Sequence, residues 1–237
     1  LSKREVLEVP EVMIGGMPDM RNLYANTLNE TQKILFKRKN MAILAVSALI
    51  PALTAGLIIL AQNQAQISVF RFSDYPVLVL GLFTNVLLPL FVFMWIADTF
   101  AGEFGDNTLK LTLLRPITRY KVYVSKINAA GILILITLLV AGISALLAGM
   151  ILDESVSLTA GELFKILLVY LAATVPLLAL AIAAAFIAQF FKGSSGALVT
   201  SVFVYLLARA LSAAFPGFAK VSLFSYLDWH WLWLGSS

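Results

Sequence analysis

Five long apolar segments, separated by short charged stretches, limit what this chain can fold into. They cover residues 41–61, 75–97, 127–152, 166–191 and 193–214, and Arg209 is the one charged residue within them. Each is long enough to cross a bilayer as a helix, which takes about 20 predominantly apolar residues. Charged residues make up 13% of the chain, about half the share in a typical soluble domain. The sequence therefore predicts an all-α integral membrane protein with five transmembrane helices.

Basic residues gather on one side of the predicted membrane, which gives the orientation. The opposite loops carry Asp74, Asp153, Glu154 and Glu162, with Arg71 and Lys165. By the positive-inside rule, the N-terminus and the 98–126 loop are expected in the cytoplasm. We expect a multi-pass protein of a bacterial or archaeal cell membrane. The basic residues that support this orientation are Lys33, Lys37, Arg38, Lys39, Lys110, Arg115, Arg119, Lys121, Lys126 and Lys192.

The two ends of the chain differ from the apolar segments. Residues 1–18 are predicted to be a loose lead, and residues 19–39 an amphipathic helix on the cytoplasmic membrane surface, with Leu23, Leu28 and Leu35 on one face. Residues 40–237 form the membrane domain. Its aromatic-rich stretch 215–234 predicts an extracellular re-entrant hairpin at the headgroup layer. Because an odd number of spans leaves the C-terminus outside, we expect a sixth span to be missing at that end.

The charged segment 98–126 is the longest polar interruption between spans. Asp106 and Lys110 are spaced as an acid-before-base pair on a helix, and Leu109 and Leu113 share one face. Pro116 ends this predicted amphipathic helix. Such a helix suits docking into a groove on a cytoplasmic partner, but it equally suits a connecting helix anchored to lipid headgroups. The residues alone leave both readings open.

The run from Ala101 to Arg119, followed by Lys126, resembles the first cytoplasmic loop of ABC type-2 transporter permeases. Those loops read as Glu, a few residues, Gly-Thr-Leu, an apolar pair, small-Pro-apolar-small-Arg and then Gly-Lys. In this chain Asn107, Arg115 and Ser125 replace residues that are usually glycine or another small residue. The matching residues are Glu103, Thr108, Leu109, Leu113, Leu114, Pro116, Arg119 and Lys126.

The resemblance implies that the loop is a coupling helix contacting a separate ATPase subunit, and that residues 40–237 are a permease domain. The lead helix, through Leu23, Leu28 and Leu35, would contact the same partner. A second permease subunit, identical or different, is implied, as is outward transport of an amphipathic or hydrophobic substrate such as a lipid, peptide or drug. The implied ATPase contacts are Glu103, Asn107, Thr108, Leu109, Lys110, Leu113, Arg115, Pro116 and Arg119.

Catalytic and metal chemistry are not expected in this chain. It contains no cysteine and one histidine, and it has no Gly-Lys-Ser/Thr phosphate-binding loop. ATP and Mg²⁺ are therefore expected on the partner subunit, with no cofactor bound here. The positive charges are explained by membrane orientation and membrane lipid, so nucleic acid is not an expected partner.

Two other function classes stay open at this stage. A secondary transporter or channel would place ionisable residues along a pathway, and the first four predicted spans contain no Asp, Glu, Lys, Arg or His. Asn85 and Arg209 are the candidate pathway residues, although Arg209 lies near the outer end of its span and can instead snorkel to the headgroups. A non-transporting sensor or assembly protein would also accommodate an amphipathic loop.

Overall fold

The described residues of the computed structural model, 18–65, 74–103, 118–152, 160–215 and 227, are almost entirely helical. Within these ranges, five helical segments are long and apolar enough to cross a membrane, which confirms the predicted all-α class and span number. In chain order the elements are α1 (Pro18–Leu35), α2 (Arg38–Ala65), α3 (Asp74–Leu82), η1 (Phe83–Leu87), α4 (Leu88–Ala97), η2 (Asp98–Gly102), α7 (Arg119–Leu152), α8 (Ala160–Ala172), α9 (Thr174–Ala188) and α10 (Ser194–Ala214).

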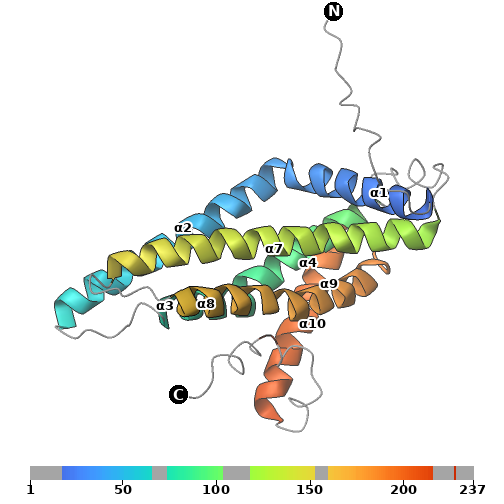
Figure 1. The fold of residues 1–237 in the computed structure, drawn as a ribbon. Helices are drawn as coiled ribbons and strands as arrows, with labels where there is room; N and C mark the ends of the chain where they lie inside the picture. The colour runs from blue at the N-terminus through green and yellow to red at the C-terminus, as the bar shows by residue number, and fades with distance from the viewer. Residues whose placement is uncertain (1–17, 66–73, 104–117, 153–159, 216–226, 228–237) are drawn as a thin grey trace, which may run out of the picture.

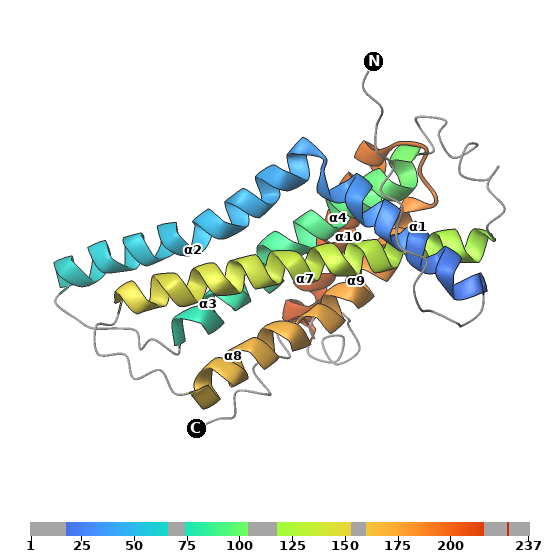
Figure 2. The same cartoon turned by 45° about the horizontal axis from the view of Figure 1, so that its top comes forward.

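Helix α7 is the centre of the bundle (Figures 1 and 2). It packs against α1 and α2 on one side and against α3, α8 and α9 on the other. Helix α10 contacts α4 and α9 and runs steeply across the direction of the other helices. We call the end where α1, η2 and the start of α7 meet the α1 end, and the opposite end of the bundle the far end.

Helix boundaries differ from the predicted spans around the charged loop. The second span continues through η2 to residue 102, and α7 begins at Arg119 rather than at residue 127. The predicted helix 19–39 instead ends at Leu35, and α2 begins at Arg38. The Asn40 side chain caps this break because its amide donates a hydrogen bond to the carbonyl of Ile34. Charged residues that the sequence placed in loops are thus helical, because they find partners inside the bundle.

The helical spans are irregular near two of their prolines. Pro89 lacks the N–H that would bond to the carbonyl of Asn85, and the π-helical segment η1 immediately precedes this region. The Tyr205 hydroxyl of α10 donates to that freed carbonyl at 2.6 Å. Pro176 lies just after the break between α8 and α9. A hydroxyl group from a neighbouring helix therefore replaces the hydrogen bond that Pro89 removes, as membrane helices require.

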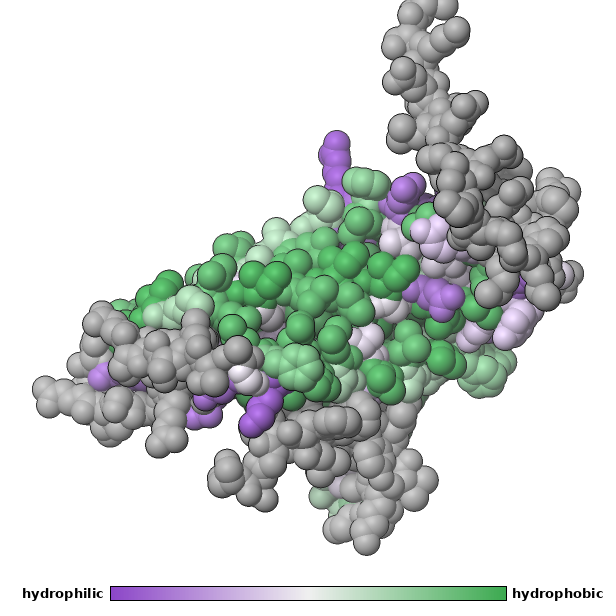
Figure 3. All heavy atoms as spheres, in the orientation of Figure 1, coloured by the Kyte–Doolittle hydropathy of each residue, from purple (hydrophilic) through white to green (hydrophobic). Residues whose placement is uncertain are grey.

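The outer surface of the bundle is apolar. Large side chains such as Leu57, Ile151, Phe186 and Phe203 are exposed on α2, α7, α9 and α10. Figure 3 shows this apolar surface along the length of the helices, with hydrophilic side chains towards the ends. A water-facing protein rarely exposes so much contiguous apolar surface. Lipid is the solvent that this surface fits, so the chain is a multi-pass membrane protein.

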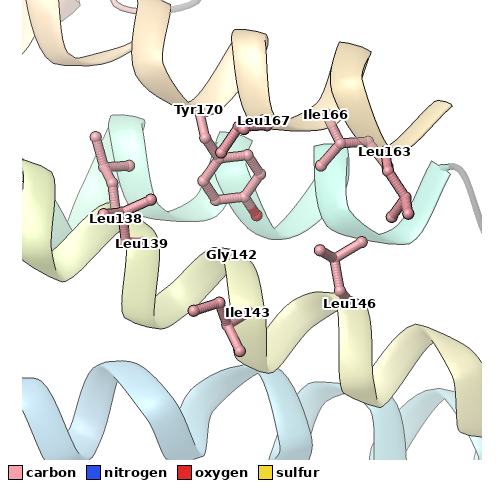
Figure 4. A pocket seen from close by; sticks show the side chains of 9 residues that line it. All are labelled: Leu138, Leu139, Gly142, Ile143, Leu146, Leu163, Ile166, Leu167 and Tyr170. Atoms are coloured by element: carbon pink, nitrogen blue, oxygen red, sulfur yellow. The ribbon is translucent and has the colours of Figure 1, made fainter. Parts of the chain in front are cut away.

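A cavity of about 60 Å³ lies between α7 and α8 (Figure 4). Apolar side chains line it, together with Gly142 and the ring of Tyr170. The Tyr170 hydroxyl donates to the carbonyl of Pro76 at 2.7 Å, which fixes the ring from its far end. A Cβ added at Gly142 would lie 3.0 Å from two atoms of this ring. Gly142 therefore allows α7 and α8 to approach closely.

Gly142→Ala is expected to destabilise the protein by about 1–3 kcal/mol, the usual cost of overpacking, because the anchored Tyr170 ring cannot move aside. Gly131→Ala is the matched control. Its added Cβ would meet only the flexible tip of Leu178, at 2.8 Å, so a small rotation relieves the contact and the helix gains intrinsic stability. Thermal unfolding in detergent checks the pair, and equal stability of the two variants would contradict the assignment.

Candidate functional site

Glu103 lies between two lysines at the α1 end of the bundle. Its Oε1 accepts a hydrogen bond from Lys33 of α1 and its Oε2 accepts one from Lys126 of α7, both at 2.5 Å. Lys126 also donates to the carbonyl of Thr99 at 2.8 Å. Glu103 is 7% exposed and Lys126 is 5% exposed, whereas the side chain of Lys33 is 50% exposed. The carboxylate thus joins α1, the end of the second span and the first turns of α7.

A second polar contact ties α1 to the same turns of α7. The Asn26 amide donates to the Ser125 hydroxyl at 2.6 Å, and Ser125 in turn donates to the carbonyl of Val122. Beside them, the Lys126 ammonium lies 5.5 Å from the centroid of the Phe100 ring, a cation–π distance. Asn26, Ser125 and Lys126 are buried, whereas Phe100 and Val122 are partly exposed.

A third set of contacts holds the break between α1 and α2 against the second span. The Trp95 indole N–H donates to the Asn40 side-chain oxygen at 3.1 Å. One turn further on, Lys39 forms an ion pair with Asp98. Together with the Glu103 and Asn26 contacts, these pairs form what we call the polar junction. It consists of Asn26, Lys33, Lys39, Asn40, Trp95, Asp98, Thr99, Glu103, Ser125 and Lys126.

The electrostatics of the polar junction favour an ionised Glu103. Burial by itself raises the pKa of this carboxyl group. The hydrogen bonds and positive charges of Lys126 and Lys33 outweigh burial, so the pKa of Glu103 lies below its usual value. The carboxylate is therefore negative at neutral pH, and it binds two cations that belong to different helices.

This shift predicts a pH-dependent contribution to stability. Because the folded-state pKa of Glu103 is depressed, its contribution is present above the unfolded pKa of about 4.3 and is lost as pH falls through the folded pKa. The stability gap between the wild type and Glu103→Gln should be full at pH 7, shrink from about pH 5 downward, and close at lower pH. Unfolding followed in detergent across this range measures the gap. A gap that widens on acidification would contradict the assignment.

The face of α1 that packs in the bundle is largely polar, and the apolar face predicted for the membrane surface is partly exposed. Asn26, Thr31 and Ile34 are buried, while Tyr24 is 62% exposed and Leu28 is 40% exposed. Leu23 and Leu35 are partly buried. Helix α1 packs on the first turns of α7, where the Ser125 hydroxyl accepts a hydrogen bond from Asn26.

Most of the predicted ATPase contacts lie outside the described residues. Glu103 is described and is held inside the polar junction, and Arg119 begins α7. The carboxylate of Glu103 is therefore committed to contacts within the chain, while its predicted contact with an ATPase stays a prediction. The residues outside the described part are Asn107, Thr108, Leu109, Lys110, Leu113, Arg115 and Pro116, as are residues 1–17 and most of 215–234.

The predicted pathway residues Asn85 and Arg209 lie away from the polar junction. Asn85 is in η1, about 27 Å along the second span from Glu103 at 1.5 Å per residue. Its side-chain amide donates to the carbonyl of Gly81 at 2.9 Å. Arg209 is on α10 one turn after Tyr205, which bonds to the backbone of Asn85. These two residues therefore belong to one region, distinct from the α1 end.

Sequence reasoning missed several residues of the polar junction. Asn40 and Trp95 gave no signal because their partners are distant in the sequence. Asn26 lies off the apolar face of its helix, and nothing in the sequence indicates that it is buried against Ser125. Lys126 was noticed as part of a loop motif, and its pairing with Glu103 follows from neither spacing nor hydropathy.

Comparison with known proteins places this arrangement in a family. A family model described as ABC-2 family transporter protein matches residues 28–208, which include Glu103, Lys126 and all five spans in whole or in part. No curated protein matches the chain. Since the family match covers more than half of the sequence and agrees with the resemblance of the charged loop, the chain belongs to the ABC-2 family of transporter proteins.

Proposed function

We propose that this chain is the transmembrane subunit of an ATP-driven exporter, coupled through residues 98–126 to a separate cytoplasmic ATPase. Family membership supports an ABC-type transport permease, and the five spans supply the membrane domain. The ATPase would bind ATP and Mg²⁺, and this chain would bind neither. The proposed cargo is amphipathic or hydrophobic, because four of the spans contain no Asp, Glu, Lys, Arg or His in their apolar stretches.

The polar junction is the single observation that carries the coupling proposal. Glu103 immediately precedes residues 104–117, and α7 begins just after them. Glu103 and Lys126 join these two flanks directly, and Lys33 adds α1. A force applied to residues 104–117 by a docked partner would therefore be transmitted, through the buried Glu103 contacts, to α1, the second span and α7. A solvated linker would need no such buried ion pair, whose desolvation is costly.

The charge distribution supports a cytoplasmic position for the α1 end. Described cations there include Lys33, Lys37, Arg38, Lys121 and Lys192, whereas Asp74 and Glu162, with Lys165, lie at the far end. By the positive-inside rule the α1 end would face the cytoplasm, where an ATPase has access to ATP. Exposed Leu28 would contribute to the ATPase contact, with Leu23 and Leu35, beside the coupling residues from Glu103 to Arg119.

The proposal includes a second permease subunit, identical or different. The helices of one chain pack against one another with α7 at the centre. A path for cargo is therefore more readily built between two such bundles than within one. Asn85 and Arg209 are the proposed pathway residues. Tyr205 holds the backbone of Asn85 against α10, which would let movement of α10 open or close this region.

Affinity purification in mild detergent tests the proposed function. The tagged full chain, extracted from its native membrane, should bring down a nucleotide-binding subunit in stoichiometric amounts, and the complex should hydrolyse ATP. A tagged, unrelated membrane protein of similar size is the control. Recovery of the chain without any ATPase, under conditions that preserve other membrane complexes, would contradict the proposal.

A further inference from the structure

The break between α1 and α2 forms a basic corner, consisting of Phe36, Lys37, Arg38 and Met41. Two nearby lysines are neutralised within the chain, since Lys33 pairs with Glu103 and Lys39 pairs with Asp98. Lys37 and Arg38 have no acidic partner among the described residues. Arg38 is exposed, and it is the first residue of the first span. Within the described part of the chain, the corner therefore carries two uncompensated positive charges where the chain enters the membrane.

The apolar residues of the basic corner are also exposed. Phe36 is 73% exposed and Met41 is 51% exposed. From Met41 the exposed apolar surface continues along α2, and Figure 3 shows hydrophilic side chains projecting next to this apolar surface near the turn between α1 and α2. The stripe that follows Met41 consists of Val46, Leu49, Leu53, Leu57 and Leu60.

Charge and apolar surface together select the partner. A free phosphate would satisfy Lys37 and Arg38 but would leave Phe36 and the α2 stripe uncovered. An acidic protein surface would likewise match the cations but not an apolar stripe that runs along a membrane span. A phospholipid with a net negative headgroup matches both, because its phosphate lies at the level of the cations and its acyl chains extend along the span.

We propose that the basic corner binds the headgroup of an anionic phospholipid, with an acyl chain lying along the exposed stripe of α2. The site is adjacent to the polar junction, because Lys39 and Asn40 follow Arg38 directly in the chain. The proposal goes beyond the transport function and does not depend on an ATPase. A lipid bound here stabilises the start of α2, and with it the contacts that Asn40 and Lys39 make to the second span.

Thermal unfolding of the purified chain in detergent tests this proposal without any partner subunit. Phosphatidylglycerol and phosphatidylcholine with the same acyl chains are added separately. Phosphatidylglycerol, added well above its dissociation constant, should raise the Tm by about 5 °C more than phosphatidylcholine does. High salt should reduce this difference, and inorganic phosphate at the same concentration should not reproduce it.

Two variants with equal charge changes assign the effect to the corner. Lys37→Gln/Arg38→Gln should lose the difference between the two lipids. Lys165→Gln/Lys192→Gln, which neutralises two other exposed lysines, should retain it, as should the charge-conserving exchange Lys37→Arg/Arg38→Lys. The proposal is overturned if the corner variant keeps the full phosphatidylglycerol shift, if both lipids stabilise the wild type equally, or if inorganic phosphate stabilises it as much as phosphatidylglycerol.

Discussion

Replacing Glu103 by Gln is expected to lower the free energy of unfolding by about 3 kcal/mol, the scale measured for removing one partner of a buried ion pair. The carboxylate is 7% exposed and its main partner Lys126 is 5% exposed, so the variant leaves a buried ammonium group without its counter-charge. The ion pair between Lys33 and Glu103 contributes little to this loss, because half of the Lys33 side chain is exposed to solvent. Unfolding in detergent at neutral pH measures the change, and Glu162→Gln, at an exposed position, should stay within about 0.5 kcal/mol of the wild type.

A double-mutant cycle separates the pair from its surroundings. Lys126→Met alone should also be strongly destabilising, because it removes the buried counter-charge of the carboxylate. The double variant Glu103→Gln/Lys126→Met should lose clearly less free energy of unfolding than the sum of the two single variants. The reason is that the double variant has no unpaired buried charge. Lys33→Gln alone should cost less than about 1 kcal/mol. Additive effects of the two buried positions would mean that they do not interact as the structure shows.

Leu109→Asp is expected to reduce association with the ATPase subunit by more than about tenfold, which corresponds to 1.4 kcal/mol. In the proposed function Leu109 belongs to the apolar face that docks on the ATPase, and a carboxylate there would be buried without a partner. Co-purification of the ATPase with the tagged variant measures the loss. Lys165→Asp, which also introduces a carboxylate but at the far end, should leave association unchanged.

The Glu103 and Leu109 variants should differ in what they disturb. Leu109→Asp should leave the thermal stability of the isolated chain unchanged while it weakens the complex. Glu103→Gln should lower the stability of the isolated chain itself. If Leu109→Asp retained a stoichiometric ATPase, residues 104–117 would not be the docking element, whatever the stability of the polar junction.

The membrane architecture could be predicted from the sequence because it rests on local composition. Each span is a nearly uninterrupted apolar stretch, and length and hydropathy suffice to identify it. Helix ends near charged residues could not be predicted in the same way. Lys126 and Glu103 belong to a charged segment that composition places outside the membrane, yet both are buried because each binds the other.

The polar junction itself depended on contacts that periodicity does not encode. Lys33 and Glu103 are 70 positions apart, and Asn26 and Ser125 are 99 apart. The spacing of apolar residues in α1 identified an amphipathic helix, but it could not show that α1 packs through Asn26 on the polar surface around Ser125. Likewise Pro89 indicates a freed carbonyl at Asn85, while only the fold shows that Tyr205 binds it.

Site-specific photo-crosslinking in intact native membranes tests the central claim most directly. A photoreactive residue at position 109 reports on the charged segment, and one at position 147, on the exposed face of α7 within a membrane span, serves as the lipid-facing control. The account predicts a crosslink from position 109 to a nucleotide-binding ATPase subunit and none from position 147. An efficient crosslink from position 109 to lipid alone, with no ATPase adduct, would contradict the claim that this segment docks an ATPase.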